Sequence, residues 1–372
     1  MEDAFVKFIH LADLHLGRQL HGYALLDIQK ELLAKVTAYI HDHDIRVVVI
    51  AGDVYDRAIP SQEAVTLLSD FLSTLILDLH VKVLMIAGNH DGADRLDFTS
   101  SILEKEGLYI CANAKAQMPY VEIEDVKFYL LPFIKPSGVH QLFPEAPRDN
   151  YHVALAYYLD KQDLTAPGKK VLVTHQFVGH HAQTSDSELT LSVGGTEVID
   201  PKIFESFDYV ALGHLHAPQY VGRETIRYSG SLAKYSFDEA HQKKGFLVVD
   251  TKDFSSTFVP LKPSLDVRVL KGSLDELIHR QDAHNDDLLA AELSDEKIIP
   301  HAIDTLRTYY PHILSISYPQ IVTTTHFDKH SMSEIQSKNA LDLFIDFYRD
   351  MTMREPDEEE IQLISTLLED NV

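Results

Sequence analysis

The stretch Val47–Asp56, with the sequence VVVIAGDVYD, constrains the fold of this chain more than any other. Its first four residues are β-branched aliphatics, which predicts a strand without a solvated face, in the middle of a sheet. Gly52 permits a sharp turn after the strand, and Asp53 follows directly. A carboxylate held at the end of a central strand can bind two metal ions at once, one through each oxygen.

Two further strands have the same layout. Phe5–Ile9 leads toward Asp13 and His15, which are two residues apart and so point the same way in an extended backbone. Val81–Ala87 leads into the polar residues of 88–91, GNHD. Segments with helical periodicity separate the three strands, and this order predicts a parallel βαβαβ sheet with right-handed crossovers. The three polar loops then lie along one edge of the sheet, where open sheets place their sites.

The helix predicted over Gln62–Leu79, with Ser61 as its N-cap, is more apolar than one amphipathic stripe requires. A second face of this helix must therefore be covered as well. Burial between two layers of the same chain and contact with a second copy explain the pattern equally well.

The second half of the main domain is rich in predicted strands. Lys170–Thr174 ends at His175, and Phe207–Leu212 ends at the segment 213–216, GHLH. Three more short strands follow, at 225–228, 245–250 and 255–259. A second sheet packed on the first predicts a four-layer α/β/β/α sandwich.

Two prolines in Pro260–Pro263 predict a hinge. We therefore expect a main domain over 1–262, a small α+β capping domain over 263–322, a linker over 323–337 and a helical tail over 338–372. The tail carries apolar residues at helical spacing on either side of an acidic turn, which favours docking to another protein over packing onto the chain itself. These residues are Leu341, Phe344, Ile345, Phe347, Tyr348, Ile361, Leu363, Ile364, Leu367 and Leu368.

Composition limits the compartment and the partners. The 372 residues include one cysteine, Cys111, which fits a reducing compartment, and neither a membrane span nor a signal peptide is evident. We therefore expect a cytoplasmic protein. The formal charge of −24 opposes a general affinity for nucleic acid, so any DNA binding must be local or shared with a partner.

Seven polar residues each follow a predicted strand and can converge. They are carboxylates, imidazoles and one amide, without a thiolate, and this donor set favours Mn²⁺, Fe or Zn²⁺ over copper or an iron–sulfur cluster. With one carboxylate shared, two ions would lie ~3.5–4 Å apart, as in-line displacement at phosphorus requires. The seven candidate ligands are Asp13, His15, Asp53, Asn89, His175, His214 and His216.

His90, next to Asn89, is the expected proton donor to the leaving oxygen, and Asp91 is expected to orient it. A structural histidine or a further metal ligand is the alternative role for His90. The other histidines, among them His10, have no partner at ligand spacing.

With these motifs in place, the chain resembles the calcineurin-like metallophosphoesterases, and within them the nuclease subunits that work with an SbcC-type ATPase. The resemblance covers nearly the whole chain. His10–Gly17 is similar to the opening motif of the family, and Tyr228–Ser231 with Tyr235–Phe237 is similar to its late signature.

This resemblance implies Mn²⁺-dependent cleavage of DNA, with Mg²⁺, Fe or Zn²⁺ also possible. It implies 3′→5′ exonuclease activity on duplex ends and endonuclease activity on single strands and hairpins, in DNA repair, recombination and replication. It further implies a capping domain that faces DNA, a tail that binds the ATPase, and a homodimer formed by helices 62–79 and 95–106. The implied ligand sets are Asp13, His15, Asp53 and His216 for one ion, and Asp53, Asn89, His175 and His214 for the other.

One position departs from part of the family. Archaeal and eukaryotic relatives have a second catalytic histidine three residues after the shared aspartate, whereas this chain has Asp56. A phosphatase or small-molecule phosphodiesterase with the same ligands is the main competing function. A scaffold without catalysis is disfavoured because the ligand set is complete, and a protein that only binds nucleic acid is disfavoured by the charge.

Overall fold

The computed structural model describes residues 5–179, 182–188, 198–280 and 284–322, and a few residues between 341 and 362 (341, 344–345, 348–349, 356–357 and 360–362). The chain divides into two compact units, Met1–Ser317 and Tyr318–Val372. The second unit is described at α9 (Pro319–Val322) and at the short C-terminal pieces. The predicted linker over 323–337 lies outside the described residues, as does most of the tail predicted over 338–372.

The first sheet has six strands in the order β14-β13-β1-β4-β5-β6. Strand β4 lies inside it, flanked by parallel partners, and all five of its residues are buried, which confirms the place predicted from its apolar sequence. The strands are β1 (Lys7–Leu11), β4 (Val47–Ala51), β5 (Lys82–Ile86), β6 (Leu108–Cys111), β13 (Gly245–Asp250) and β14 (Ser256–Pro260).

The second sheet also has six strands, in the order β11-β12-β10-β9-β8-β7. Its four inner strands are parallel, and the two edge strands run antiparallel to their neighbours. The strands are β7 (Tyr120–Ile123), β8 (Val126–Leu131), β9 (Lys169–His175), β10 (Tyr209–Gly213), β11 (Gln219–Val221) and β12 (Arg223–Tyr228).

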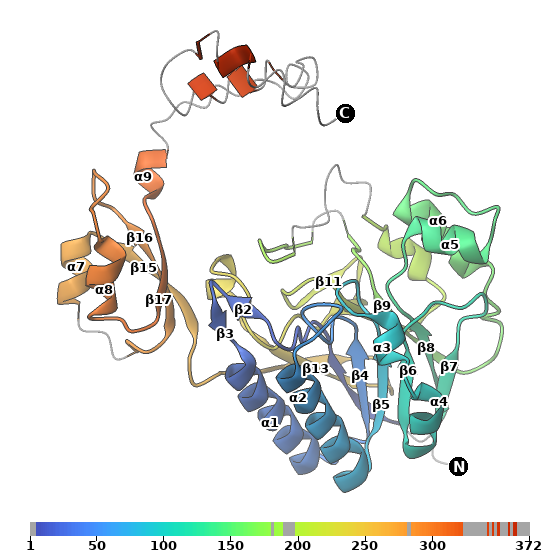
Figure 1. The fold of residues 1–372 in the computed structure, drawn as a ribbon. Coiled ribbons are helices and arrows are strands. Elements are labelled where there is room, and N and C mark those ends of the chain that lie inside the picture. The colour runs from blue at the N-terminus through green and yellow to red at the C-terminus, as the bar shows by residue number, and fades with distance from the viewer. Residues whose placement is uncertain are drawn as a thin grey trace. The chain divides into compact units, whose positions relative to one another are not determined.

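The two sheets pack face to face through a buried apolar layer, and helices cover their outer faces. The ring of Phe8 meets those of Phe128 and Tyr209 edge-on across this layer, at centroid distances of 5.3 and 5.7 Å. Figure 1 shows α1 (Leu26–Asp42) beside α2 (Gln62–Ser73), with α5 (Pro136–Leu142) and α6 (Tyr151–Asp160) in another part of the sandwich. The predicted four-layer α/β/β/α arrangement is confirmed.

Two predicted helices differ in detail. The helix predicted over 62–79 is α2 followed by a π-helical turn, η1 (Thr74–Asp78). The single helix expected over 95–106 is wrong: this region contains α3 (Ala93–Leu96), α4 (Ser100–Leu103) and a 3₁₀ turn, η2 (Glu104–Glu106). Thr99 has a left-handed φ of 63°, which a continuous right-handed helix cannot contain.

The capping region forms a small parallel sheet in the order β15-β16-β17, with α7 and α8 between its strands. Helix α7 begins with a capping box in which Ser273 and Glu276 bond each other's backbone N–H. The elements are β15 (Val267–Gly272), α7 (Leu274–His279), β16 (Leu288–Leu293), α8 (Ala302–Arg307) and β17 (Ile313–Ser317).

Short elements complete the described fold: the hairpin of β2 (Gln19–Leu20) and β3 (Tyr23–Ala24), and the 3₁₀ turns η4 (Pro201–Phe204) and η5 (Asp238–His241). Among the described residues, no helix has both the length and the apolar character needed to cross a bilayer.

Candidate metal centre

All seven predicted ligands lie at the carboxyl ends of parallel strands, where the two sheets meet. Asp13 and His15 follow β1, Asp53 follows β4, and Asn89 follows β5 in the first sheet. In the second sheet His175 is the last residue of β9, while His214 and His216 follow β10. Residues up to about 200 positions apart in sequence therefore meet at one edge.

The backbone at this edge is strained. Asp13, His15, Asp53 and His214 have φ values of 53°, 41°, 48° and 108°, a region that residues other than glycine rarely adopt. Strain of this kind persists only where surrounding contacts enforce it, and it gathers at functional sites. Here the Asp13 N–H donates to the carbonyl of Gly52 at 3.1 Å, and the His15 N–H donates to that of Asp53 at 2.9 Å.

Two glycines let the loops approach closely enough for their side chains to converge. A Cβ on Gly52, whose φ is +87°, would lie 2.5 Å from Nδ1 of His175. A Cβ on Gly213 would lie 1.9 Å from the carbonyl oxygen of Ala51. Neither position accepts a side chain without moving the strands apart.

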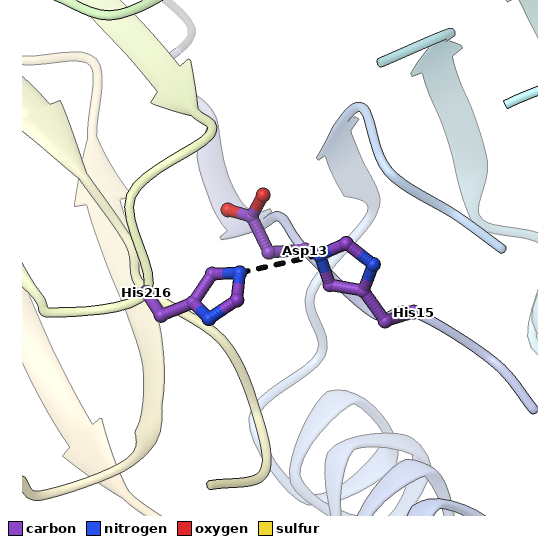
Figure 2. A group of neighbouring side chains, drawn as sticks. All are labelled: Asp13, His15 and His216. Atoms are coloured by element: carbon purple, nitrogen blue, oxygen red, sulfur yellow. Dashed lines mark hydrogen bonds between the residues drawn. The ribbon is translucent and has the colours of Figure 1, made fainter. Parts of the chain in front are cut away.

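One group of ligand atoms belongs to Asp13, His15 and His216, which lie within 4.8 Å of one another. Figure 2 shows the two imidazoles facing each other below the carboxylate, with 3.2 Å between their Nε2 atoms. The Nδ1–H of His216 donates to the carboxylate of Glu239 at 3.0 Å, so its Nε2 presents a lone pair to the centre.

The second group forms around Asn89. Its Oδ1 lies 3.0 Å from Nε2 of His175 and 3.0 Å from Nδ1 of His214. The Nδ1–H of His175 donates to the carbonyl of Ala51 at 2.8 Å, and this bond turns the Nε2 lone pair toward the centre.

Asp53 stands between the two groups. Its Oδ2 is 3.5 Å from Nε2 of His15 and 3.4 Å from Nε2 of His175. Its Oδ1 accepts the backbone N–H of His90 at 2.9 Å, which fixes the carboxylate. Oδ2 alone therefore faces both groups, which fits an oxygen shared by two ions and differs from the expectation of one oxygen for each ion.

The charges of these residues fit bound cations. Burial raises the pKa of Asp13 to about 7, so its carboxylate needs a positive neighbour to stay ionised. Burial lowers the pKa of an imidazole, yet the Asp53 carboxylate more than offsets this at His175 and raises its pKa to about 9. Without a metal this ring is therefore protonated at neutral pH, and it must release its Nε2 proton for an ion to bind. Burial lowers the pKa of His214 to about 3 and holds that of His15 well below its usual value, so both rings are neutral, as ligation requires. Oxygen and imidazole donors around buried carboxylates suit divalent metal ions.

His90 lies beside this centre, with its ring 4.9 Å from that of His15. Its Nδ1–H donates to the carbonyl of Asp56 at 2.9 Å, which leaves Nε2 available. The Asp91 carboxylate accepts the N–H groups of Val54, Tyr55 and Gly88 at 3.1, 2.9 and 2.8 Å. These contacts differ from the expected role of Asp91 in orienting His90: Asp91 ties two ligand loops together, and Asp56 holds the ring.

The residues that orient the ring of His216 were not predicted from the sequence. Glu239, in η5, is fully buried and pairs with the ammonium of Lys244 at 2.7 Å, and Ser187 Oγ lies 2.8 Å from Nδ1 of His216. Burial favours a neutral carboxyl, but the bonds from His216 and Lys244 hold the pKa of Glu239 well below its usual range. The only sequence signal was the motif Tyr235–Phe237, which ends two residues before Glu239.

His10 is a buried histidine with a structural role. Its ring is buried between the two sheets, 3.1 Å from the carbonyl of Leu212 and 3.3 Å from the hydroxyl of Tyr209. Burial lowers the pKa of His10 to about 3, so the ring is neutral.

Comparison with known proteins agrees with this architecture. The family described as calcineurin-like phosphoesterase matches residues 6–218, and the family described as type 5 capsule protein repressor C-terminal domain (SbcD_C) matches residues 263–352. The chain belongs to the calcineurin-like phosphoesterases and, within them, to the SbcD family. A curated relative, the SbcD subunit of the nuclease SbcCD from Staphylococcus epidermidis, is 34% identical over 356 residues, which is 93% of this chain and 94% of the relative.

Solved structures align more loosely. An archaeal phosphodiesterase aligns with a TM-score of 0.32 and 14% identity over 69% of this chain and 100% of its own. The protein TT1561 of Thermus thermophilus aligns with a TM-score of 0.42 and 12% identity over 70% of this chain and 100% of its own.

Proposed function

We propose that this protein is a metal-dependent DNA nuclease that hydrolyses phosphodiester bonds together with an SbcC-type ATPase. The observation that carries the proposal is the gathering of the seven candidate ligands at one sheet edge, with the Asp53 carboxylate within 3.5 Å of both His15 and His175. The activities are those of a 3′→5′ exonuclease on duplex ends and an endonuclease on single strands and hairpins. They would serve DNA repair and recombination in the cytoplasm, on nucleoid DNA.

The chain's own residues prepare the site for this chemistry. When bound, a pair of divalent ions supplies an activated water and neutralises charge on the phosphoryl oxygens. Asp13, His15, Asp53 and His216 would hold one ion, and Asp53, Asn89, His175 and His214 the other. The bonds from His216 to Glu239 and from His175 to Ala51 fix both rings before the substrate arrives, so no reorganisation is needed during the reaction.

His90 would protonate the leaving oxygen from Nε2. Its Nδ1–H is engaged by the Asp56 carbonyl, so the ring is held with Nε2 free. Asp91 would act indirectly, because its carboxylate fixes the loops that carry Asp53 and Asn89. We propose Mn²⁺ as the working metal, since it accepts mixed carboxylate and imidazole ligands; Mg²⁺, Fe and Zn²⁺ are also chemically compatible.

A homodimer is part of the proposal. Apolar side chains on and beside α2 and α4 are exposed, namely Val65, Leu77, Phe98 and Ile102. The first three of them border a cavity of about 450 Å³. The exposed residues therefore favour contact with a second copy over burial of the second face of α2 within the chain. A patch of this kind is typical of a protein interface. Sedimentation should give a dimer that Leu77→Glu converts to a monomer.

The tail over 338–372 would bind the ATPase. The apolar residues from Leu341 onward support this role, as does the name of the relative, which assigns it to SbcCD. Removal of the residues from 341 onward should abolish co-purification with an SbcC-type partner while leaving metal binding intact.

The test of the function uses purified protein with Mn²⁺ and circular single-stranded DNA, with an aryl phosphomonoester assayed in parallel. His90→Ser should lose DNA cleavage while still binding metal. His41→Ser, an exposed histidine at the end of α1, is the matched control and should cleave normally. Strong monoester turnover with intact DNA would make this protein a phosphatase and contradict the proposal.

A further inference from the structure

Each of the first two ligand motifs is followed by an arginine. Arg18 comes three residues after His15, and Arg57 comes four residues after Asp53. The two guanidinium groups meet on one carboxylate, that of Asp56. Arg18 Nη1 lies 3.0 Å from Oδ1 of Asp56, and Arg57 Nη2 lies 3.5 Å from Oδ2.

This cluster of Arg18, Asp56 and Arg57 adjoins the metal centre. A carboxylate oxygen of Asp56 lies within 4.8 Å of ring nitrogens of both His15 and His90. The carbonyl of Asp56 accepts the Nδ1–H of His90 at 2.9 Å. An anion bound by the two arginines would therefore lie next to the position of the reacting phosphate.

Arg18 is fixed in place before any ligand binds. Its backbone N–H donates to the carbonyl of His15 at 3.0 Å, and its guanidinium lies 5.5 Å from the ring centre of Tyr235. The side chain of Arg18 is 17% exposed and that of Arg57 is 64% exposed. One arginine is thus rigid and half-buried, while the other is free to close over a ligand.

The charge of the cluster is unbalanced. Two guanidinium groups share one carboxylate, which leaves a surplus positive charge in a chain whose formal charge is −24. Guanidinium forks suit carboxylate and phosphate oxygens alike, so Asp56 occupies the position that a phosphate would take. A polyanion repelled by most of this surface would find local attraction here.

We propose that Arg18 and Arg57 bind the backbone phosphate adjacent to the scissile one, and that Asp56 holds this subsite until the strand arrives. The inference rests on the proposed nuclease function and deepens it: the subsite distinguishes a polynucleotide, which has a second phosphate, from an isolated phosphodiester. Arg18 and Arg57 act as substrate-positioning residues.

The test compares two substrates with the Mn²⁺-loaded protein: a single-stranded oligonucleotide, and bis(4-nitrophenyl) phosphate, which has no second phosphate. Arg57→Ala should raise KM for the oligonucleotide about tenfold, the scale of one charged hydrogen bond, and leave the small diester within about twofold. Arg18→Lys, which retains the charge but not the fork, should have a smaller effect in the same direction. Arg46→Ala is the matched control, because Arg46 pairs with Asp44 at the opposite end of β4.

Asp56→Asn should act in the opposite direction. It removes the competing carboxylate but retains the backbone carbonyl that holds His90, so KM for the oligonucleotide should fall about threefold. Binding measured by fluorescence anisotropy in EDTA gives a readout that does not depend on turnover. There Arg57→Ala should reduce the slope of log K against log salt by about one phosphate contact.

Two results would overturn the subsite. One is an equal loss on both substrates in Arg57→Ala, which would indicate a structural role. The other is unchanged oligonucleotide binding and KM in Arg57→Ala. A wild-type protein that hydrolyses neither substrate, alone or with an SbcC-type ATPase, but binds the oligonucleotide through Arg57 would contradict the proposed nuclease function while supporting the subsite.

Discussion

His216 and His175 belong to the two different groups of candidate ligands, and they are oriented by different kinds of acceptor. Nδ1 of His216 donates to Glu239, a buried carboxylate that is itself paired with Lys244. Nδ1 of His175 donates to a backbone carbonyl, that of Ala51. An ionised acceptor makes the imidazole a stronger base than a neutral one does. We therefore expect the two halves of the candidate centre to differ in how firmly they would hold a metal and in whether a side-chain substitution can weaken them.

The largest effect is expected from a variant that disrupts both halves of the centre. Asp53→Asn replaces a carboxylate oxygen that lies within 3.5 Å of both His15 and His175. Loss of a shared ligand is worth several kcal/mol, so kcat/KM on DNA should fall on the order of 10³-fold. Titration calorimetry with Mn²⁺ should show loss of tight binding at both sites; retention of two tight sites would contradict the shared role.

Glu239→Gln should weaken one half only. The loss of the charged acceptor should reduce the affinity of the ion at His216 by roughly 10–100-fold, while the other ion binds normally. Lys244 would then be a buried, unpaired charge, which costs about 3–5 kcal/mol in stability.

The double variant Glu239→Gln/Lys244→Met separates these two effects. It should recover stability in urea unfolding, because the unpaired ammonium is gone, but it should not recover metal affinity. Recovery of both would show that Glu239 acts through the fold and not through His216.

His175 should make the stability of the metal-free protein depend on pH. In EDTA the folded-state pKa of His175, about 9, exceeds the unfolded value of 6.5, so its contribution to stability is complete below 6.5 and is lost as pH rises through 9. Asp13, with a pKa of about 7, completes its titration earlier. Between pH 7.5 and 9 the metal-free protein should therefore lose roughly 1.5 kcal/mol, and His175→Asn should abolish that slope.

The smallest effect concerns Ser187. Its hydroxyl lies 2.8 Å from Nδ1 of His216 and donates to Glu239 at 2.6 Å. Ser187→Ala should weaken the His216 half by about 0.5–1.5 kcal/mol, a few-fold in Mn²⁺ affinity, and leave the other half unchanged. An effect as large as that of Glu239→Gln would mean that the hydroxyl, not the carboxylate, orients the ring.

The difference between the two halves also explains what could be predicted from the sequence. The seven candidate ligands could be predicted because each follows an apolar strand, and parallel strands bring their carboxyl ends to one edge. Glu239 and Lys244 follow no such strand, and their relation to His216 exists only in three dimensions. His175 is oriented by the carbonyl of Ala51, a group that every residue has and that no sequence pattern marks.

Local backbone geometry was the second feature that could not be predicted from the sequence. The family resemblance implied one helix over 95–106, but the left-handed turn at Thr99 divides the segment. Asp91 is a similar case, because a carboxylate next to His90 in sequence points instead at the N–H groups of Val54, Tyr55 and Gly88. Neighbouring positions in the sequence therefore determine neither the course of that helix nor the direction in which the Asp91 carboxylate points.

The most direct test of the central claim is anomalous diffraction at the manganese edge from crystals soaked in Mn²⁺. We expect two peaks ~3.5–4 Å apart, both next to the Asp53 carboxylate, with one peak beside His216 and the other beside His175. A single peak, or a pair centred on Asp56 and His90, would contradict it.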